Sequence, residues 1–353
     1  MSSNNLALIF NKVPTGVPEP GKHILVKDIG FNHDQELAEG SVILRILYSS
    51  LDHYLGALLR TPDPDQDPND ITAAVPLGNA IVAFALAEVL RSSRSDYVRG
   101  DIVLGNFPIQ QYCSSTLENQ PNLQKVDHTK GPKDIRHYLG AMGMPGLVAY
   151  SSLHEIGKPK AGEVLFVSSA GGAVGQLVAQ LAKQTGLRVI GSVGSDEKLK
   201  FLIGDLGIEG FNYKTEKAAD ALRRLAPEGI DIYYDNVGGE QLEAAIDVIN
   251  SHGRIIACGQ ISQYHLAPEE RYPLRNTMYL IGKQVTWRGF MVGDPAMGLK
   301  WKARFHEHMS KLLDDGIVIS KMDEQTGMNE AAQALVRMLK GHTFGKAILR
   351  VKE

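Results

Sequence analysis

A glycine cluster between two apolar runs is the first stretch of this sequence that could do chemistry. Residues 164–202 read VLFVSSAGGAVGQLVAQLAKQTGLRVIGSVGSDEKLKFL and contain the spacing Ser169-x-x-Gly172-x-x-Gly175. The order of apolar run, glycine turn, helical pattern and second apolar run is typical of a βαβ unit that binds a dinucleotide. Small residues let the backbone approach a pyrophosphate, and free N–H groups at the start of the helix attract it. We therefore predict a pyrophosphate site here; a tight turn without a ligand is the alternative.

The end of the second apolar run favours NADP over NAD. In units that bind NAD, an acidic residue ends this strand and holds the ribose hydroxyls. Here Ser192-Val193-Gly194-Ser195 occupies that place, and Lys198 follows. Gly194 leaves room, Ser195 offers a donor and Lys198 can supply a positive charge, so we predict a site for the 2′-phosphate of NADP. The alternative for Lys198 is a solvated helix lysine.

Neither a zinc site nor a covalent nucleophile is indicated. The two cysteines, Cys113 and Cys258, stand far apart in the sequence, with no close cluster of cysteine and histidine. The usual structural and catalytic zinc sites need four and three protein ligands, so we predict no metal. His53 is the one tempting ligand, and a packing or surface role explains a lone histidine more simply. The sequence also contains no G-x-S-x-G elbow and no P-loop.

The composition is that of a globular protein of about two domains. The chain has 353 residues, 43% of them hydrophobic and 22% charged, with a net charge of −3. The weak charge argues against nucleic acid or a membrane surface as partner. The least polar stretch, residues 71–90, contains Pro76 and Gly78, so we expect buried strands and turns there. Two free thiols and a start unlike a signal peptide predict a cytoplasmic protein.

The patterns of strands and helices predict an α/β fold in two domains. Residues 20–50 and 80–113 hold short apolar runs typical of β structure, and 61–70 is a proline-broken loop. After residue 145 apolar runs recur in EVLFVSS, RVIGSV, IDIYYDNV, RIIACGQ and QVTWRGF, with helical patterns at residues 173–185, 196–206, 216–226 and 239–251. This alternation indicates a doubly wound parallel sheet. We place a β-rich domain at residues 1–145, completed by 311–353, and the parallel sheet at 146–310.

Along nearly its whole length, the chain resembles a zinc-independent medium-chain dehydrogenase/reductase, of the branch that contains prostaglandin reductases and alkenal double-bond reductases. The motifs that carry the resemblance are GMPGLVAY (143–150), SSAGGAVGQ (168–176), GSDEK (194–198), FNYK (211–214), YDNVGGE (234–240), GRIIACGQISQY (253–264), RGFMV (288–292) and GHTFGK (341–346). The resemblance implies a GroES-like β-rich domain joined to a Rossmann domain, with the C-terminal segment returning to the β domain.

The resemblance also implies roles by position. Gly172, Ala173, Val174 and Gly175 would lie against the pyrophosphate, and Lys198 and Tyr213, beside Gly194 and Ser195, would hold the 2′-phosphate. The other cofactor-binding residues would be Asn236, Cys258, Gly259, Ile261, Phe290, Met291, Val292 and Thr343. Tyr264 would lie near the nicotinamide and the substrate.

Three departures from the family pattern concern the substrate more than the cofactor. The family's Asp-Pro-Tyr-Met-Arg reads DHYLG at residues 52–56, which keeps the tyrosine, Tyr54. Thr343 replaces an asparagine, and PLGNAIVAFALAEV replaces a glycine-rich strand. All three fall where substrate or nicotinamide would be lined.

The activity that this resemblance implies is reduction by NADPH of a carbon–carbon double bond conjugated to a carbonyl. Hydride would add to the β-carbon, and a hydrogen-bond donor would stabilise the enolate. Tyr264 is the first candidate for that donor and Tyr54 the second, and either could instead be a packed tyrosine. Quinone reduction, and an NADPH-binding scaffold without turnover, remain alternatives. We expect a homodimer, because family members usually pair and QVTWRGF is typical of an apolar edge strand.

Overall fold

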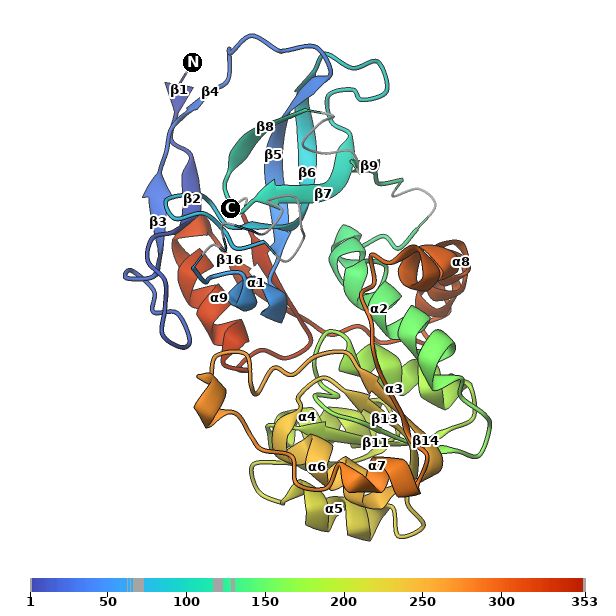
Figure 1. The fold of residues 1–353 in the computed structure, drawn as a ribbon. Helices are drawn as coiled ribbons and strands as arrows, with labels where there is room; N and C mark the ends of the chain where they lie inside the picture. The colour runs from blue at the N-terminus through green and yellow to red at the C-terminus, as the bar shows by residue number, and fades with distance from the viewer. Residues whose placement is uncertain are drawn as a thin grey trace. The chain divides into compact units, whose positions relative to one another are not determined.

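The structure, a computed structural model, describes residues 2–61, 63, 65, 73–116, 123–127 and 131–351 (Figure 1). The chain forms two compact units. Unit 1 comprises Met1–Leu139, Met322–Thr343 and Ala347–Glu353, and unit 2 comprises Gly140–Lys321 and Phe344–Lys346. The sequence pattern predicts these divisions at residues 145 and 310 instead. The observed unit 2 is longer at both ends because helices α2 (Met144–Ser152) and α8 (Lys300–Asp314) pack against each other within it.

Unit 1 is built on a seven-stranded sheet of mainly antiparallel pairs, in the region where the short apolar runs predict β structure. The strand order is β16-β17-β5-β6-β7-β9, and β8 pairs with β5. The strands are β5 (Ser41–Ser50), β6 (Val82–Ser92), β7 (Ile102–Pro108), β8 (Tyr112–Thr116), β9 (Gln124–Lys125), β16 (Met322–Thr326) and β17 (Lys346–Arg350). Pairing of β17 with β5 confirms that the C-terminal strand returns to the first domain. The apolar stretch at 71–90 supplies part of the central strand β6, whereas most of the predicted loop at 61–70 lies outside the described residues.

Smaller elements complete unit 1. Two further pairs of strands are β2 (Leu6–Phe10) with β3 (Ile24–Asp28) and β1 (Ser2–Ser3) with β4 (Phe31–Asn32). The helical elements are α1 (His53–Ala57), η1 (Ile135–Leu139), η6 (Met328–Glu330) and α9 (Ala331–Leu339). Buried residues of α9 share one core with strands β2, β5 and β6, so the C-terminal helix is integral to this unit.

Unit 2 contains a six-stranded parallel sheet in the order β12-β11-β10-β13-β14-β15. The strands are β10 (Val164–Val167), β11 (Arg188–Val193), β12 (Glu209–Asn212), β13 (Ile230–Asp235), β14 (Ile249–Ala257) and β15 (Thr286–Gly289). Numbered from β10, this is the Rossmann order 3-2-1-4-5-6. In such a sheet a ligand binds beyond the carboxyl ends of the strands, at the point where the order reverses. That point is between β10 and β13.

Helices cover both faces of the parallel sheet. On one face, Phe166, Tyr233 and Phe211 pack with Leu222 and Leu242 of the helices. On the other face, η2 packs against β14. A Cβ on Gly157 of η2 would lie 3.1 Å from Cδ1 of Ile256 in that strand. The helical elements are α2, η2 (Leu153–Gly157), α3 (Gly175–Gln184), α4 (Asp196–Lys200), η3 (Phe201–Asp205), α5 (Ala218–Leu225), α6 (Gly239–Val248), η4 (Pro268–Glu270), α7 (Met278–Gly282), η5 (Pro295–Leu299) and α8.

The structure departs from the predicted elements of unit 2 in three places. Strand β12 was not predicted, because its four residues, EGFN, show no apolar run. Helix α6 ends at Val248 rather than at residue 251, since β14 begins at Ile249. Helix α3 spans Gly175–Gln184 rather than residues 173–185, and its residues from Gly175 to Ala182 are all buried, because α2, β10 and β11 all contact this helix. Within the described part of the chain, no helix is long and apolar enough to cross a membrane.

Candidate nucleotide-binding site

The glycine cluster forms a tight turn between β10 and α3. Ser169 has a φ of +54°, in the left-handed region, and its carbonyl accepts the Gly172 N–H at 2.9 Å. A Cβ on Gly175 would lie 2.2 Å from the Ser169 carbonyl oxygen, so only glycine lets the helix begin this close to the turn. A non-glycine residue with positive φ is strained, and such residues concentrate at ligand sites. The geometry fits a turn that brings backbone close to a bound phosphate.

Lys198 and Tyr213 converge on the end of β11, beside this turn. A Cβ on Gly171 would lie 3.2 Å from Cδ of Lys198, so the aliphatic part of the lysine covers Gly171. A Cβ on Gly194 would lie 2.9 Å from the Tyr213 hydroxyl oxygen, so the phenol covers Gly194. Oγ of Ser195 accepts the Lys198 N–H at 3.3 Å. The structure thus brings together the residues that were predicted to hold the 2′-phosphate.

Two acidic residues that the prediction of a 2′-phosphate site did not consider follow strand β11. Asp196 and Glu197 are exposed residues in the first turn of α4. Nδ2 of Asn212 donates to the Asp196 carboxylate at 2.8 Å, and Oδ1 of Asn212 accepts the Lys214 N–H at 3.1 Å. These two bonds fix the orientation of the Asn212 amide and hold Asp196 at the end of β12. The predicted absence of an acid therefore applies to strand β11 and not to the helix after it.

A buried polar network joins the ends of β10 and β13, at the point where the strand order reverses. Oγ of Ser168 accepts the Asn236 N–H at 2.9 Å, and the Ser168 carbonyl accepts from Nδ2 of Asn236 at 2.7 Å. Oδ1 of Asp235 accepts the Tyr233 hydroxyl at 2.8 Å and two backbone N–H groups of the next turn. Burial raises the pKa of Asp235, although these hydrogen bonds oppose the shift. The network fixes the loop that begins at Asn236.

The loop after β14 is fastened to the same strand end. The N–H groups of Cys258 and Gly259 donate to the Asp235 carbonyl at 2.9 and 3.0 Å, and that of Ile261 donates to the Asn236 carbonyl at 3.2 Å. Burial raises the pKa of the Cys258 thiol to about 12. The thiol therefore remains protonated at neutral pH and is no nucleophile.

Tyr264 turns back over this loop. Its hydroxyl oxygen accepts the Gln260 N–H at 3.1 Å, and a Cβ on Gly259 would lie 3.0 Å from the same oxygen. The side chain is 39% exposed. Burial of the hydroxyl raises the pKa of Tyr264 above 10.0, although the hydrogen bond from Gln260 opposes this shift. The phenol is therefore neutral near pH 7. Because the oxygen is used as an acceptor in this bond, the O–H can donate to another group.

The other predicted residues lie at an edge of the sheet or in unit 1. Phe290, Met291 and Val292 follow the edge strand β15, and Met291 is 51% exposed. Tyr54 and Thr343 belong to unit 1. Tyr54 lies in α1 against the core of that unit, where burial and the nearby Asp52 carboxylate raise its pKa far above the usual range.

Among the described residues, no group of three or more histidine, cysteine or acidic side chains has the arrangement of a metal site. Cys113 and Cys258 are both free thiols. Burial raises the pKa of Cys113 to about 12, as it does for Cys258. These side chains therefore suggest no ligand set.

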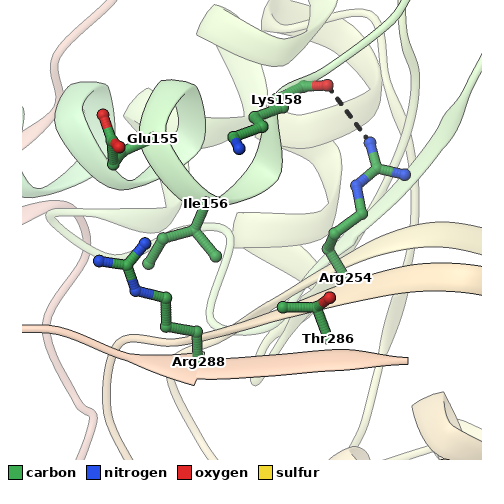
Figure 2. Close-up of a pocket in the computed structure, with 6 residues that line it drawn as sticks. All are labelled: Glu155, Ile156, Lys158, Arg254, Thr286 and Arg288. Atoms are coloured by element: carbon green, nitrogen blue, oxygen red, sulfur yellow. Dashed lines mark hydrogen bonds between the residues drawn. The ribbon is translucent and has the colours of Figure 1, made fainter. Parts of the chain in front are cut away.

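A separate hollow of about 260 Å³ lies beside the edge strand β15 (Figure 2). It is lined by Glu155, Ile156, Lys158, Arg254, Thr286 and Arg288. Arg254 is held by Glu163, at 2.6 and 3.0 Å, and by the Gly157 carbonyl. Lys300 pairs with Glu155 at 2.6 Å and lowers the pKa of that carboxyl. None of the predicted site residues lines this hollow, so it is distinct from the candidate nucleotide site.

Several residues that shape the site were not predicted. Ser168 and Asp235 lie within two of the quoted motifs, so a signal existed for both, but their side chains were not singled out. Asn212 also stands in a quoted motif, yet nothing in the sequence indicates that it contacts Asp196. Gly171 and its contact with Lys198 could not be predicted, because two adjacent glycines leave open which one lies under the side chain.

This fold, a β-rich unit and a Rossmann unit with a glycine turn, is that of a two-domain dinucleotide-binding protein. Two family models match the chain: "N-terminal domain of oxidoreductase" over residues 7–126 and "Zinc-binding dehydrogenase" over residues 173–314. The NADP-dependent oxidoreductase RED1 of Cochliobolus heterostrophus is 41% identical over 99% of this chain and 98% of its own. The 2-alkenal reductase (NADP(+)-dependent) of Nicotiana tabacum is 34% identical over the same shares of the two chains.

A solved structure extends the comparison to three dimensions. CurA from Vibrio vulnificus, in complex with NADPH, superposes with a TM-score of 0.87 at 30% identity, covering 99% of each chain. The chain belongs to the medium-chain dehydrogenase/reductase family, in its zinc-independent branch of alkenal and enone reductases. The resemblance predicted from the motifs is thereby confirmed.

Proposed function

We propose that this protein uses NADPH to reduce the carbon–carbon double bond of α,β-unsaturated ketones or aldehydes. The observation that carries the proposal is the arrangement beyond the carboxyl ends of the parallel strands. The glycine turn follows β10, Lys198 follows β11 and Tyr213 follows β12. Tyr264, whose hydroxyl is neutral, lies in the segment after β14. The relatives named as NADP-dependent oxidoreductase and 2-alkenal reductase support both halves of the proposal.

The residues of the glycine turn fit a dinucleotide. A Cβ at position 175 would collide with the Ser169 backbone. Helix α3 begins at Gly175, and the N–H groups at the very start of a helix lack intrahelical acceptors, whereas the Gln176 N–H already donates to the Gly172 carbonyl at 3.2 Å. The N–H groups at the very start of α3 would bind the pyrophosphate. Lys198 and Tyr213 would bind the 2′-phosphate, the lysine by charge and the phenol by a hydrogen bond. When bound, NADPH supplies the hydride for the β-carbon of the substrate.

Tyr264 would act on the substrate's carbonyl oxygen. As hydride adds to the β-carbon, negative charge moves to this oxygen, and the Tyr264 O–H donates a hydrogen bond to it. Removing one such donor typically costs ~10²–10³ in rate. A neutral phenol suffices because the enolate spreads its charge over a conjugated system. The same hydroxyl, or water, can then supply the proton for the α-carbon. Tyr54 of unit 1 is the second candidate for this donor.

Steady-state assays with three classes of acceptor test the proposal. NADPH oxidation would be followed with an enone, a quinone and an isolated ketone at matched concentrations. We expect turnover of the enone and almost none of the isolated ketone. Turnover of the quinone alone would favour quinone reduction. NADPH binding without oxidation across the panel would favour a scaffold without turnover.

We also propose a homodimer that forms through β15. Among the strands that the structure describes, β15 pairs with β14 alone, and all four of its residues are exposed, with Trp287 37% exposed. Nearby in sequence, Met278 and Ile281 of α7 are 73% and 74% exposed. Pairing of two β15 strands across a twofold axis would cover the edge and some of this apolar surface. Light scattering at micromolar concentration should give twice the chain mass, and a monomer mass would refute the pairing.

The cytoplasm is the compartment that we propose. Both cysteines are free, as expected in a reducing compartment. Fractionation of the source cells should recover the protein with cytoplasmic markers, and recovery in an oxidising compartment would contradict this assignment.

A further inference from the structure

The tripeptide Phe344–Lys346 lies against the glycine turn, although the chain on either side of it belongs to unit 1. The Gly345 N–H donates to the Gly171 carbonyl at 2.9 Å, and Gly345 forms a parallel β-bridge with Gly172. A residue near the C-terminus thus contacts the backbone of the turn that would bind the pyrophosphate.

Other contacts also hold the tripeptide in place. The Lys346 N–H donates to the Lys321 carbonyl at 2.9 Å. Gln176, which is 1% exposed and follows Gly175, accepts the Lys321 N–H at 2.9 Å and donates to the Lys321 carbonyl at 3.2 Å. The Phe344 ring also meets the Phe201 ring edge to face at 5.2 Å. The tripeptide is therefore fixed between the glycine turn and the segment at Lys321.

Position 345 admits only glycine. Its φ is +83°, which side chains rarely adopt. A Cβ there would lie 2.1 Å from the Lys321 carbonyl oxygen and 2.4 Å from the carbonyl carbon. Any side chain would push the tripeptide away from Lys321 and disturb its contact with Gly171.

The hydrogen bond from Gly345 restricts the backbone of the glycine turn. Gly171 and Gly172 have no side chains to restrict their backbone, so the peptide between them has wide conformational freedom. The hydrogen bond from Gly345 fixes the carbonyl of that peptide, and the Ser169 carbonyl fixes its N–H. A loop held in its binding conformation before the ligand arrives has less entropy to lose on binding.

We propose that Gly345 is a positioning residue for the cofactor, which fixes the Gly171–Gly172 peptide in the conformation that binds the pyrophosphate. The inference rests on the proposed function, because it takes the glycine turn as the pyrophosphate site. It adds that Gly345, which was not among the predicted cofactor-binding residues, raises the affinity for the pyrophosphate, the part that NADPH and NADH share, through its hydrogen bond to Gly171.

The test compares two alanine variants with similar backbone strain. Gly345→Ala places a Cβ against Lys321. Gly316 has a φ of +68°, and a Cβ added there would meet no atom within 4 Å, so Gly316→Ala is the matched control. Dissociation constants of NADPH and NADH would be measured by calorimetry well below the unfolding temperature. We expect Gly345→Ala to weaken both cofactors by the same factor, about 3- to 10-fold, as for one lost hydrogen bond, and Gly316→Ala to bind as the wild type.

The outcomes separate positioning from a purely structural role. A structural role alone would lower the unfolding temperature of Gly345→Ala and leave both dissociation constants unchanged, which would overturn the proposal. Equal weakening in Gly316→Ala, or weakening of NADPH alone, would also overturn it. If the wild type binds neither cofactor, the proposed function itself fails. If the wild type binds NADPH but Gly345→Ala binds both cofactors as tightly as the wild type, only this inference fails.

A milder variant keeps the proposal testable if Gly345→Ala does not fold. Phe344→Leu removes the ring contact with Phe201 and keeps an apolar side chain of similar bulk. We expect it to weaken NADPH and NADH equally, by about 2- to 5-fold, a fraction of one hydrogen bond. Unchanged affinity for both cofactors in a folded Phe344→Leu protein would overturn the proposal.

Discussion

Replacing Lys198 by methionine separates the charge of this side chain from its packing. The aliphatic part of Lys198 covers Gly171, and methionine keeps an unbranched apolar chain of similar length. The variant therefore removes the ammonium group and leaves the contact with the glycine turn largely in place. If Lys198 binds the 2′-phosphate, only NADPH should lose affinity.

The size of the loss follows from the strength of a charged hydrogen bond. Such a bond contributes about 1.5–3 kcal/mol, which corresponds to about 10- to 150-fold in affinity. Lys198 is only partly buried, so solvent screens its charge, and we expect the lower part of this range, about 10- to 30-fold. NADH carries no 2′-phosphate, so its dissociation constant should change by less than about 2-fold.

Fluorescence titration with both cofactors, at low and high salt, measures these changes. Lys200→Met is the matched control, because Lys200 is exposed at the end of the same short helix. The difference between wild type and Lys198→Met should shrink as salt rises. Equal losses of affinity for NADPH and NADH in Lys198→Met, or an unchanged NADPH affinity, would refute the proposal that Lys198 binds the 2′-phosphate.

Three further predictions concern catalysis. Tyr264→Phe should lower kcat with an enone by about 10- to 1000-fold while NADPH affinity holds, and full activity would transfer the role to Tyr54. Because burial raises the pKa of Tyr264 above 10.0, the phenol stays protonated, so kcat should show no loss from this group between pH 7 and about 9.5; a fall centred near pH 8 would contradict this. Dialysis against a chelator should leave activity unchanged, and loss that zinc alone restores would contradict a metal-free mechanism.

Local signals made much of unit 2 predictable. The runs VLFV and RVIGSV became strands β10 and β11 because apolar β-branched residues suit a buried parallel strand. The glycine spacing predicted the turn, since a Cβ at position 175 would collide with backbone. β12 escaped prediction because EGFN lacks both an apolar run and alternation.

Long-range contacts within the site could not be predicted. The sequence shows Lys198 and Tyr213, and the structure shows that they lie over Gly171 and Gly194; that they bind a phosphate stays a prediction. The contact between Gly345 and Gly171 depends on two backbone groups far apart in the chain, which no residue pattern encodes. The resemblance drew attention to GHTFGK, but not to this hydrogen bond.

The fate of the transferred hydride tests the central claim most directly. The protein would be incubated with an enal and NADPH deuterated at the transferring position, and the product analysed by NMR. The account predicts a saturated aldehyde with deuterium at the β-carbon and a proton from solvent at the α-carbon. An allylic alcohol with deuterium on the former carbonyl carbon would contradict it, because the hydride would then have added to the carbonyl.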